Sequence, residues 1–593
     1  MGFFAELKRR NVIRAALLYA GAVWALAQGI ASLGPAFGMP DWGTRWFVIA
    51  GAIGFPFWIA FAWFFEFTPD GLKRESQIDP ADSIAHRTGR KLDFAIIGVL
   101  AIAVVLLLTD RFVLHHGVNE QATIVASDKS IAVLPFVDMS QGKDQEYFSD
   151  GISEELLNLL AKIPQLQVTA RTSSFSFKGK EIGITEIAKT LHVAHVLEGS
   201  VRRAGNTVRI TAQLVDAATD TQLWSQSYDR RLDDIFAIQD EIAADVVKQL
   251  KIKLLGAAPT ARATDPGAYA LYLQARQLAQ QKTAEAFQNS DALYHRVLAI
   301  DPRYSPAWIG LANNVISEMG LGVLSGKNGY ADARAAAGKA MEIDPDNAQA
   351  HLALGRIAVY QGELTTAARQ FERALTIDPN NLDTLGSAAL LLQTLGRLNE
   401  ALVLDEVIVR RDPVNVRALY NLGTDQLWAG HFDEAIATFR TVLNLSPDRS
   451  GTHATIGQAL LLKGDARGGL EEIQRETSEL WRMVGLPMAF YALGRKADSD
   501  ATLAALIAEY TKDAPYNVAS VYAFRGEADE AFEWLDKAVE YEDAGLAEIL
   551  TENLFDKIHT DPRWPLFLRK LGKAPEQLAK IEFKVTLPES AKP

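Results

Sequence analysis

Several side chains have the types and spacings that proteins use for chemistry, but each lacks a required partner. His192 and His195 are three residues apart, which can ligate zinc on a helix, yet they straddle a predicted helix end and strand start with no third ligand evident nearby. Ser153, in "GISEE", lacks the second glycine of a nucleophile elbow and falls inside a predicted helix. The chain has no G-x-x-x-x-G-K-[ST] run for phosphates. We therefore predict no catalytic residue, no metal site and no cofactor.

Asp138 is the remaining candidate, because "PFVDMS" is similar to the strand end that carries a metal-binding aspartate in class III nucleotide cyclases. Such an enzyme needs a second aspartate to hold two magnesium ions around a triphosphate. Asp216 or Asp220 would have to serve, and neither lies in the glycine-containing hairpin that the resemblance requires. We therefore predict that the chain is not an enzyme and has no small-molecule substrate, with cyclase activity as the least favoured alternative.

Length and charge limit the class of protein further. A chain of 593 residues is too long for one core, which indicates several domains. Residues 1–114 carry a net charge of +2 and the remainder a net charge of −15. An acidic remainder repels phosphate backbones, so we predict no nucleic-acid partner. The absence of cysteine excludes disulfides and thiol catalysis.

Three apolar runs near the N-terminus predict a membrane domain over residues 1–114. The runs give transmembrane helices at about 15–37, 46–65 and 92–114, since a span needs about 20 apolar residues. Lysine and arginine cluster before the first run and between the second and third, which places those segments in the cytoplasm. Everything after the linker 115–127 is then periplasmic, and cleavage of the first run as a signal peptide is the alternative.

A helix stop recurs through the second half of the chain. Its prolines are separated by 43, 34, 34 and 34 residues and are Pro302, Pro345, Pro379, Pro413 and Pro447. Glycines keep the same period at Gly362, Gly396, Gly430 and Gly464. Proline lacks the donor that a helix interior needs, and glycine allows a close turn. A period of 34 residues with helical apolar spacing predicts stacked helical hairpins.

The unit "AQAHLALGRIAVYQGELTTAARQFERALTIDP" resembles a tetratricopeptide repeat, and the resemblance covers residues 265–575, with degenerate repeats at the C-terminal end. It implies an all-α superhelix whose groove binds a protein or peptide. We name Arg417 and Asn421, on a predicted first helix, as partner-binding residues. Asp405 replaces the apolar residue of other repeats and predicts a weaker repeat. An array that only spaces other domains is the alternative.

Residues 128–256 predict a small α/β domain with a mixed sheet. Two short strands and two helices precede three alternating strands over residues 194–231, and a final helix follows; we expect the helices on one face of the sheet. The segments "YFSDGISEEL", "LEGSVRR" and "DIFAIQDEIA" resemble the TolB amino-terminal-like domain, which implies a module for protein contacts without chemistry. Residues 576–593 are predicted to be a tail.

Together these features predict a multidomain, multi-pass protein of a bacterial inner membrane. It would have three N-terminal transmembrane helices in the lipid bilayer, a small α/β domain and a C-terminal tetratricopeptide superhelix. Its predicted function is a periplasmic scaffold that binds a protein or peptide in the groove. The alternative is a transmembrane signalling protein related to the non-catalytic part of adenylate-cyclase-associated tetratricopeptide proteins.

Overall fold

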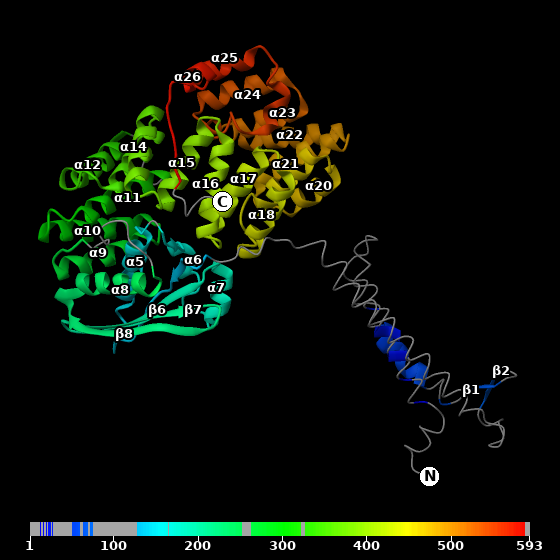
Figure 1. Ribbon diagram of the computed structural model, residues 1–593. Coiled ribbons are helices and arrows are strands. Elements are labelled where there is room, and N and C mark those ends of the chain that lie inside the picture. The colour runs from blue at the N-terminus through cyan, green and yellow to red at the C-terminus, as the bar shows by residue number, and fades with distance from the viewer. Residues whose placement is uncertain are drawn as a thin grey trace, which may run out of the picture. The chain divides into compact units, whose positions relative to one another are not determined.

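The computed structural model describes residues 127–163, 165–251, 262–321 and 327–587, together with short stretches between residues 12 and 74. The chain divides into two compact units, Met1–Ile124 and Val125–Pro593. The second unit holds a sheet and a long series of paired helices (Figure 1).

The described part of the first unit is small. A helix covers residues 50–59, and β1 (Phe65–Thr68) pairs antiparallel with β2 (Gly71–Arg74). The Tyr19 hydroxyl donates to the Gly51 carbonyl at 3.0 Å, and the Tyr19 ring stacks on Trp58 with centroids 5.7 Å apart. These contacts hold the two described helical pieces together.

The predicted membrane domain requires correction. In the part of the chain that the structure describes, no helix has both the length and the apolar composition needed to cross a membrane. Within the predicted span 46–65, the described helical residues are 50–59 and 63, and β1 begins at Phe65. On this finding, the predicted N-terminal transmembrane helices and the multi-pass inner-membrane localisation are wrong. Most of the predicted span 15–37, all of 92–114 and nearly all of the linker lie outside the described residues.

The second unit begins with a mixed sheet, as predicted. Its strand order is β5-β3-β6-β7-β8, with β4 also paired to β6. The central β3 runs parallel to β5 and β6, and β6, β7 and β8 form an antiparallel meander. The strands are β3 (Ser130–Val133), β4 (Val137–Asp138), β5 (Gln167–Val168), β6 (His195–Ala204), β7 (Thr207–Asp216) and β8 (Thr221–Arg231).

Helices cover both faces of this sheet, which corrects the prediction of one covered face. Successive side chains of a strand point to opposite faces. Leu197 packs in the core that contains α5 (Glu146–Ala161) and α8 (Ile235–Gln249). Its neighbour Val196 packs in a separate cluster with α7 (Ile184–Leu191). The short α6 (Arg171–Phe175) follows β5.

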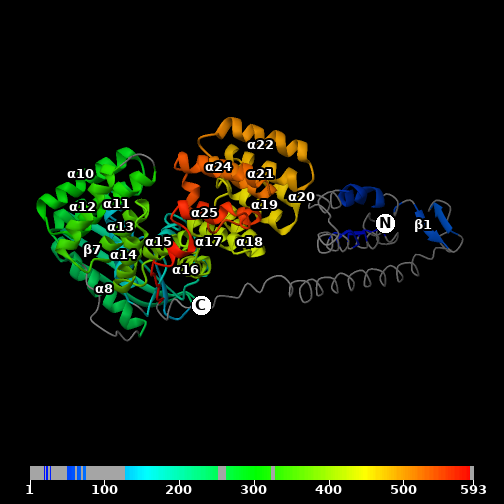
Figure 2. The same ribbon diagram turned by 90° about the horizontal axis from the view of Figure 1, so that it is seen from above.

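Eight helical hairpins follow within the described residues, each formed by two successive antiparallel helices. Figure 2 shows them side by side in chain order from α10 to α24. The helices are α9 (Pro266–Ala279), α10 (Ala284–Ile300), α11 (Ser305–Gly320), α12 (Lys327–Ile343), α13 (Ala348–Tyr360), α14 (Leu364–Ile377), α15 (Leu382–Thr394), α16 (Leu398–Arg411), α17 (Val416–Trp428), α18 (Phe432–Leu445), α19 (Thr452–Lys463), α20 (Ala466–Arg475), α21 (Glu479–Ala492), α22 (Lys496–Tyr510), α23 (Pro515–Arg525) and α24 (Ala528–Glu540).

The recurring helix stop is confirmed, and the structure shows how it joins two repeats. Helix α14 ends at Ile377, directly before Asp378-Pro379. Asn381 then caps α15, accepting from the Thr384 amide at 2.9 Å while its own amide donates to Asp378 at 3.4 Å. The same aspartate–asparagine pair occurs at Asp344 with Asn347 and at Asp412 with Asn415. The predicted glycine turns also hold, with φ of 72°, 72°, 79° and 95° at Gly362, Gly396, Gly430 and Gly464.

The array closes with shorter elements. The 3-10 helices η5 (Ala544–Ala547) and η6 (Asn553–Ile558) precede α25 (Arg563–Lys570) and α26 (Pro575–Leu578). The segment after α26 has neither helix nor strand up to residue 587. Figure 1 draws it in red, running from α26 alongside α15.

Candidate partner-binding site

The residues first considered for chemistry are held by structural hydrogen bonds. The Ser153 hydroxyl accepts from the Phe136 amide at 2.8 Å and donates to the Ser149 carbonyl at 2.9 Å. The Asp138 carboxylate accepts from the backbone amides of Ser140 and Gln145 at 2.8 and 2.9 Å, closing the loop after β4. Within the described residues, no group of three or more histidine, cysteine, aspartate or glutamate side chains could hold a metal ion.

The two histidines lie where the sequence predicted, at a helix end and a strand start. His192 ends α7 in the left-handed conformation, with φ of 54°. His195 begins β6, and its Nδ1 lies 3.3 Å from the Ser130 carbonyl. Burial lowers the pKa of His192. Their positions indicate structural roles.

Arg417 and Asn421 lie on one exposed face of α17, one turn apart. The opposite face of the helix is buried and includes Leu419 and Leu422. The structure thus brings the two predicted residues together on the surface of the array. Their role in partner binding stays a prediction.

Two first helices, α17 and α23, contact a later segment of the same chain, residues 544–558, which contains η5 and η6 and which we call the inner segment. The Asn553 amide donates to the Leu427 carbonyl of α17 at 2.9 Å, and the Tyr516 hydroxyl of α23 donates to Glu552 at 2.8 Å. Burial and the charge of Glu548 raise the pKa of Glu552 to about 7. The sequence analysis missed this segment, because the contact with α17 joins positions 126 residues apart.

A buried pair of carboxyl groups lies between α16 and α17. The sequence indicated only one of the two residues, Asp405. Asp405 of α16 and Asp425 of α17 are 3% and 0% exposed. Burial raises the pKa of Asp405 to about 7, and burial together with the charge of Asp405 raises the pKa of Asp425 to about 9. Gln393 donates to Asp425 at 2.6 Å. The Oδ2 atoms of both side chains are buried without a hydrogen-bond partner, and a proton shared between the two carboxyl groups would satisfy both and remove the repulsion of like charges.

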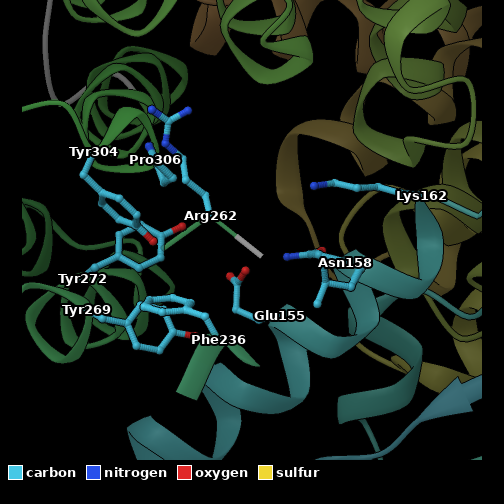
Figure 3. A pocket seen from close by; sticks show the side chains of 10 residues that line it. Glu155, Asn158, Lys162, Phe236, Arg262, Tyr269, Tyr272, Tyr304 and Pro306 are labelled. Atoms are coloured by element: carbon cyan, nitrogen blue, oxygen red, sulfur yellow. The ribbon is translucent and has the colours of Figure 1, made fainter. Parts of the chain in front are cut away.

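A small pocket of about 110 Å³ lies between the sheet domain and the first hairpins. Figure 3 shows Tyr269, Tyr272 and Tyr304 on one side, Asn158 and Lys162 on the other, and Glu155 pointing between them. Pockets for drug-sized ligands usually measure about 300–1,000 Å³. This one has room for only a few water molecules, at about 30 Å³ each. It therefore offers no site of nucleotide size.

A network of charges beside the pocket joins the two parts of the second unit. The Arg276 guanidinium of α9 forms ion pairs with Glu154 and Glu155 of α5. It also lies 5.5 Å from the centroid of the Tyr272 ring. Burial raises the pKa of Glu155 despite the attraction of Arg276, and the two glutamates raise the pKa of Arg276 against its own burial. The three side chains are 15–24% exposed, so the network is partly buried, and removing one partner leaves a partly desolvated charge.

A second junction connects α6 with the turn between α16 and α17. The Ser173 amide and hydroxyl both donate to Asp412, at 2.9 and 2.6 Å, and the hydroxyl accepts from the Val414 amide at 3.1 Å. The Ala170 amide donates to the Arg411 carbonyl at 2.9 Å. The hydrophobic core is also continuous from α5 and α8 into α9–α13. The sheet domain and the helical array therefore pack together as one unit with a shared hydrophobic core.

This geometry defines a tetratricopeptide-type helical domain with a small sheet domain packed onto it, and the comparisons with known proteins agree for the helical part. Residues 335–453 match the family model described as the cytochrome c-type biogenesis protein H TPR domain. Residues 127–245 match the second domain of HilA/YgeH-like transcriptional regulators. The resemblance to TolB amino-terminal-like domains stays a prediction.

Three solved tetratricopeptide structures resemble the array in fold. YrrB, a TPR protein with an unusual peptide-binding site, is 22% identical, with 34% of this chain and 97% of that chain covered and a TM-score of 0.27. PilW, a type IV pilus biogenesis factor, is 20% identical, with 34% and 94% covered and a TM-score of 0.30. A protein from Parabacteroides merdae is 17% identical, with 42% and 98% covered and a TM-score of 0.34.

A relative from Rhizobium meliloti (strain 1021), provisionally named adenylate cyclase 3, is 44% identical over 187 residues. The match covers 31% of this chain and 32% of the relative. The chain therefore spans about a third of the length of the curated relative that it matches.

Proposed function

We propose that the chain is a non-catalytic scaffold that binds protein partners through its tetratricopeptide array. The observation that carries this proposal is the inner segment, a stretch with two short 3-10 helices that contacts the first helices α17 and α23 at Leu427 and Tyr516. These helices bind one polypeptide segment through a backbone carbonyl and a side-chain hydroxyl, and the same kinds of group can bind a segment of another protein. The exposed face of α17 with Arg417 and Asn421 lies on the same array and is the proposed partner contact.

Affinity capture of the tagged full chain from its native cells tests this function. The double variant Arg417→Glu with Asn421→Lys should reduce recovery of specific partners roughly tenfold, the effect of losing about 1.4 kcal/mol at a hot spot. Both residues are exposed, so folding should be unaffected. Ser225→Glu, on exposed β8, introduces the same net change in charge and should leave recovery unchanged. Equal recovery with all three proteins would refute the proposed contact.

A regulatory role beside a nucleotide cyclase is the second candidate, favoured by the match to the Rhizobium meliloti protein. In that case the sheet domain would present the array to a cyclase. We propose that this sheet domain is of the TolB amino-terminal-like type. Deleting the gene should then change cyclic AMP levels in the cell, whereas a scaffold of unrelated function would leave them constant.

A further inference from the structure

The segment that follows α26 packs on the array with alternating side chains. Ile581, Phe583, Val585 and Leu587 are buried or partly buried against the array, while Glu582, Lys584 and Thr586 between them are exposed. A period of two is the pattern of an extended chain lying on a surface. We call residues 578–587 the strap.

Phe583 anchors the strap. Its side chain is 2% exposed and belongs to the hydrophobic cluster formed by residues of α13, α14, α15, α16 and α17. Among its cluster neighbours are Phe371 and Leu404. The cluster thus includes an aromatic side chain that comes from outside the repeats.

The backbone of the strap is fixed at the same place. The Lys584 amide donates to Glu372 of α14 at 2.8 Å, and Arg397, at the start of α16, donates to the Phe583 carbonyl at 2.7 Å. Glu372 and Arg397 therefore hold the two sides of one peptide bond. Arg397 is itself oriented by two hydrogen bonds to Glu400, at 2.7 and 2.6 Å. Both contacts are to backbone atoms of the strap, so they do not depend on its side chains. Selectivity for one peptide sequence over another must therefore come from the Phe583 side chain.

The hairpins under the strap contact each other directly, and the strap does not lie between them. Helices α13 to α16 form two complete hairpins that contact each other directly. The strap is joined to this surface from the C-terminal end of the array, where the covalent link gives it an effective concentration in the millimolar range. A second peptide must therefore compete with a tethered one.

We propose that this surface is a binding site for an extended partner peptide with apolar side chains at alternating positions around a central phenylalanine, and that the strap fills it until such a peptide displaces it. The proposal rests on the proposed scaffold function. It specifies the kind of peptide that binds at one site on the array. This site is separate from the exposed face with Arg417 and Asn421.

A fluorescein-labelled synthetic peptide of residues 577–590 tests the proposal by anisotropy with the full chain. The Phe583→Asp chain, whose strap is released, should bind the peptide at least tenfold more tightly than the wild-type chain. A peptide with the same Phe583→Asp change should not bind. Adding Glu372→Gln and Arg397→Gln to the Phe583→Asp chain should weaken binding about tenfold. Thermal unfolding confirms that each chain is folded, and Phe583→Ala replaces Phe583→Asp if the latter unfolds.

Two results would overturn the proposal: a folded, strap-released chain that does not bind the peptide, or equal binding by the wild-type and strap-released chains. The outcome is independent of the capture experiment. If the peptide binds but no partner is captured from cells, this site is retained and the scaffold function is rejected. If partners are captured but the peptide does not bind, only this site is rejected.

Discussion

Replacing Arg276 with methionine should lower the free energy of unfolding by about 1–3 kcal/mol, because its ion pairs are partly buried, with side chains 15–24% exposed, and lie between exposed pairs and fully buried ones. The change leaves Glu155 without its ion-pair partner, whereas Glu154 keeps its second partner, Arg171, at 3.1 Å. Because burial already raises the pKa of Glu155, the loss should be smaller at pH 5 than at pH 8. Urea denaturation of the full chain at both pH values measures the effect.

Two variants control the Arg276 experiment. Arg209→Met removes an exposed ion pair with Asp229 on the sheet and should leave stability unchanged, because exposed pairs contribute little. Adding Glu155→Gln to Arg276→Met should recover part of the loss, because Glu154 keeps its ion pair with Arg171 and no unpaired carboxylate then remains. A loss below about 1 kcal/mol in Arg276→Met at pH 8 would show that the junction does not depend on this network.

The double variant Asp405→Asn with Asp425→Asn should be more stable than the wild-type chain at pH 8, by several kcal/mol, because burial raises the pKa of both carboxyl groups and ionising them therefore destabilises the folded chain. Below the unfolded pKa of 3.8 both carboxyl groups are protonated in the folded and unfolded chains. As the pH rises, the unfolded chain releases protons that the folded chain retains. Stability is therefore lost until the pH passes the folded values of about 7 and about 9.

Denaturation curves of both proteins between pH 5 and pH 9 measure this effect. Glu548 and Glu552, whose pKa values are also raised to about 7, contribute with the same sign in both proteins. The difference between the two curves therefore isolates the aspartate pair. It should already be present at pH 5, above the unfolded pKa of 3.8, and increase with pH. A difference that is constant across this range would mean that the pair does not share a proton in the folded chain.

The repeats were predictable because their signals are local. Proline and glycine determine the backbone at Pro379 and Gly362 whatever surrounds them, and a period of 34 residues repeats these signals along the chain. The three alternating strands were predictable for the same reason, since their turns at 205–206 and 217–220 carry turn residues.

The contacts that make the array one unit with the sheet domain could not be predicted. Ser173 and Asp412 are 239 residues apart, and the repeated helix stop that contains Asp412 gives no indication of Ser173. Asp405 was predicted to weaken one repeat, but its partner Asp425 lies on the next helix at a position that no local pattern identifies. The strap had a readable signal, the alternation around Phe583, although nothing in the sequence indicates the surface on which it lies.

The membrane prediction failed for a different reason. Hydropathy averages composition over about 20 residues, and the runs in the first unit satisfy that average. Within the predicted span 46–65, however, the structure places helix at residues 50–59 and 63 and begins β1 at Phe65. A hydropathy average does not show where helix gives way to strand.

The central claim is that the chain works by holding other polypeptides on its repeat array, and site-specific photocrosslinking in native cells tests it most directly. A benzoylphenylalanine residue is placed at position 417, 421 or 225 of the full chain, the last on exposed β8. We predict that positions 417 and 421, one turn apart, crosslink the same partner and that position 225 does not. Crosslinks of equal yield from all three positions, or none from the two positions on α17, would contradict this account.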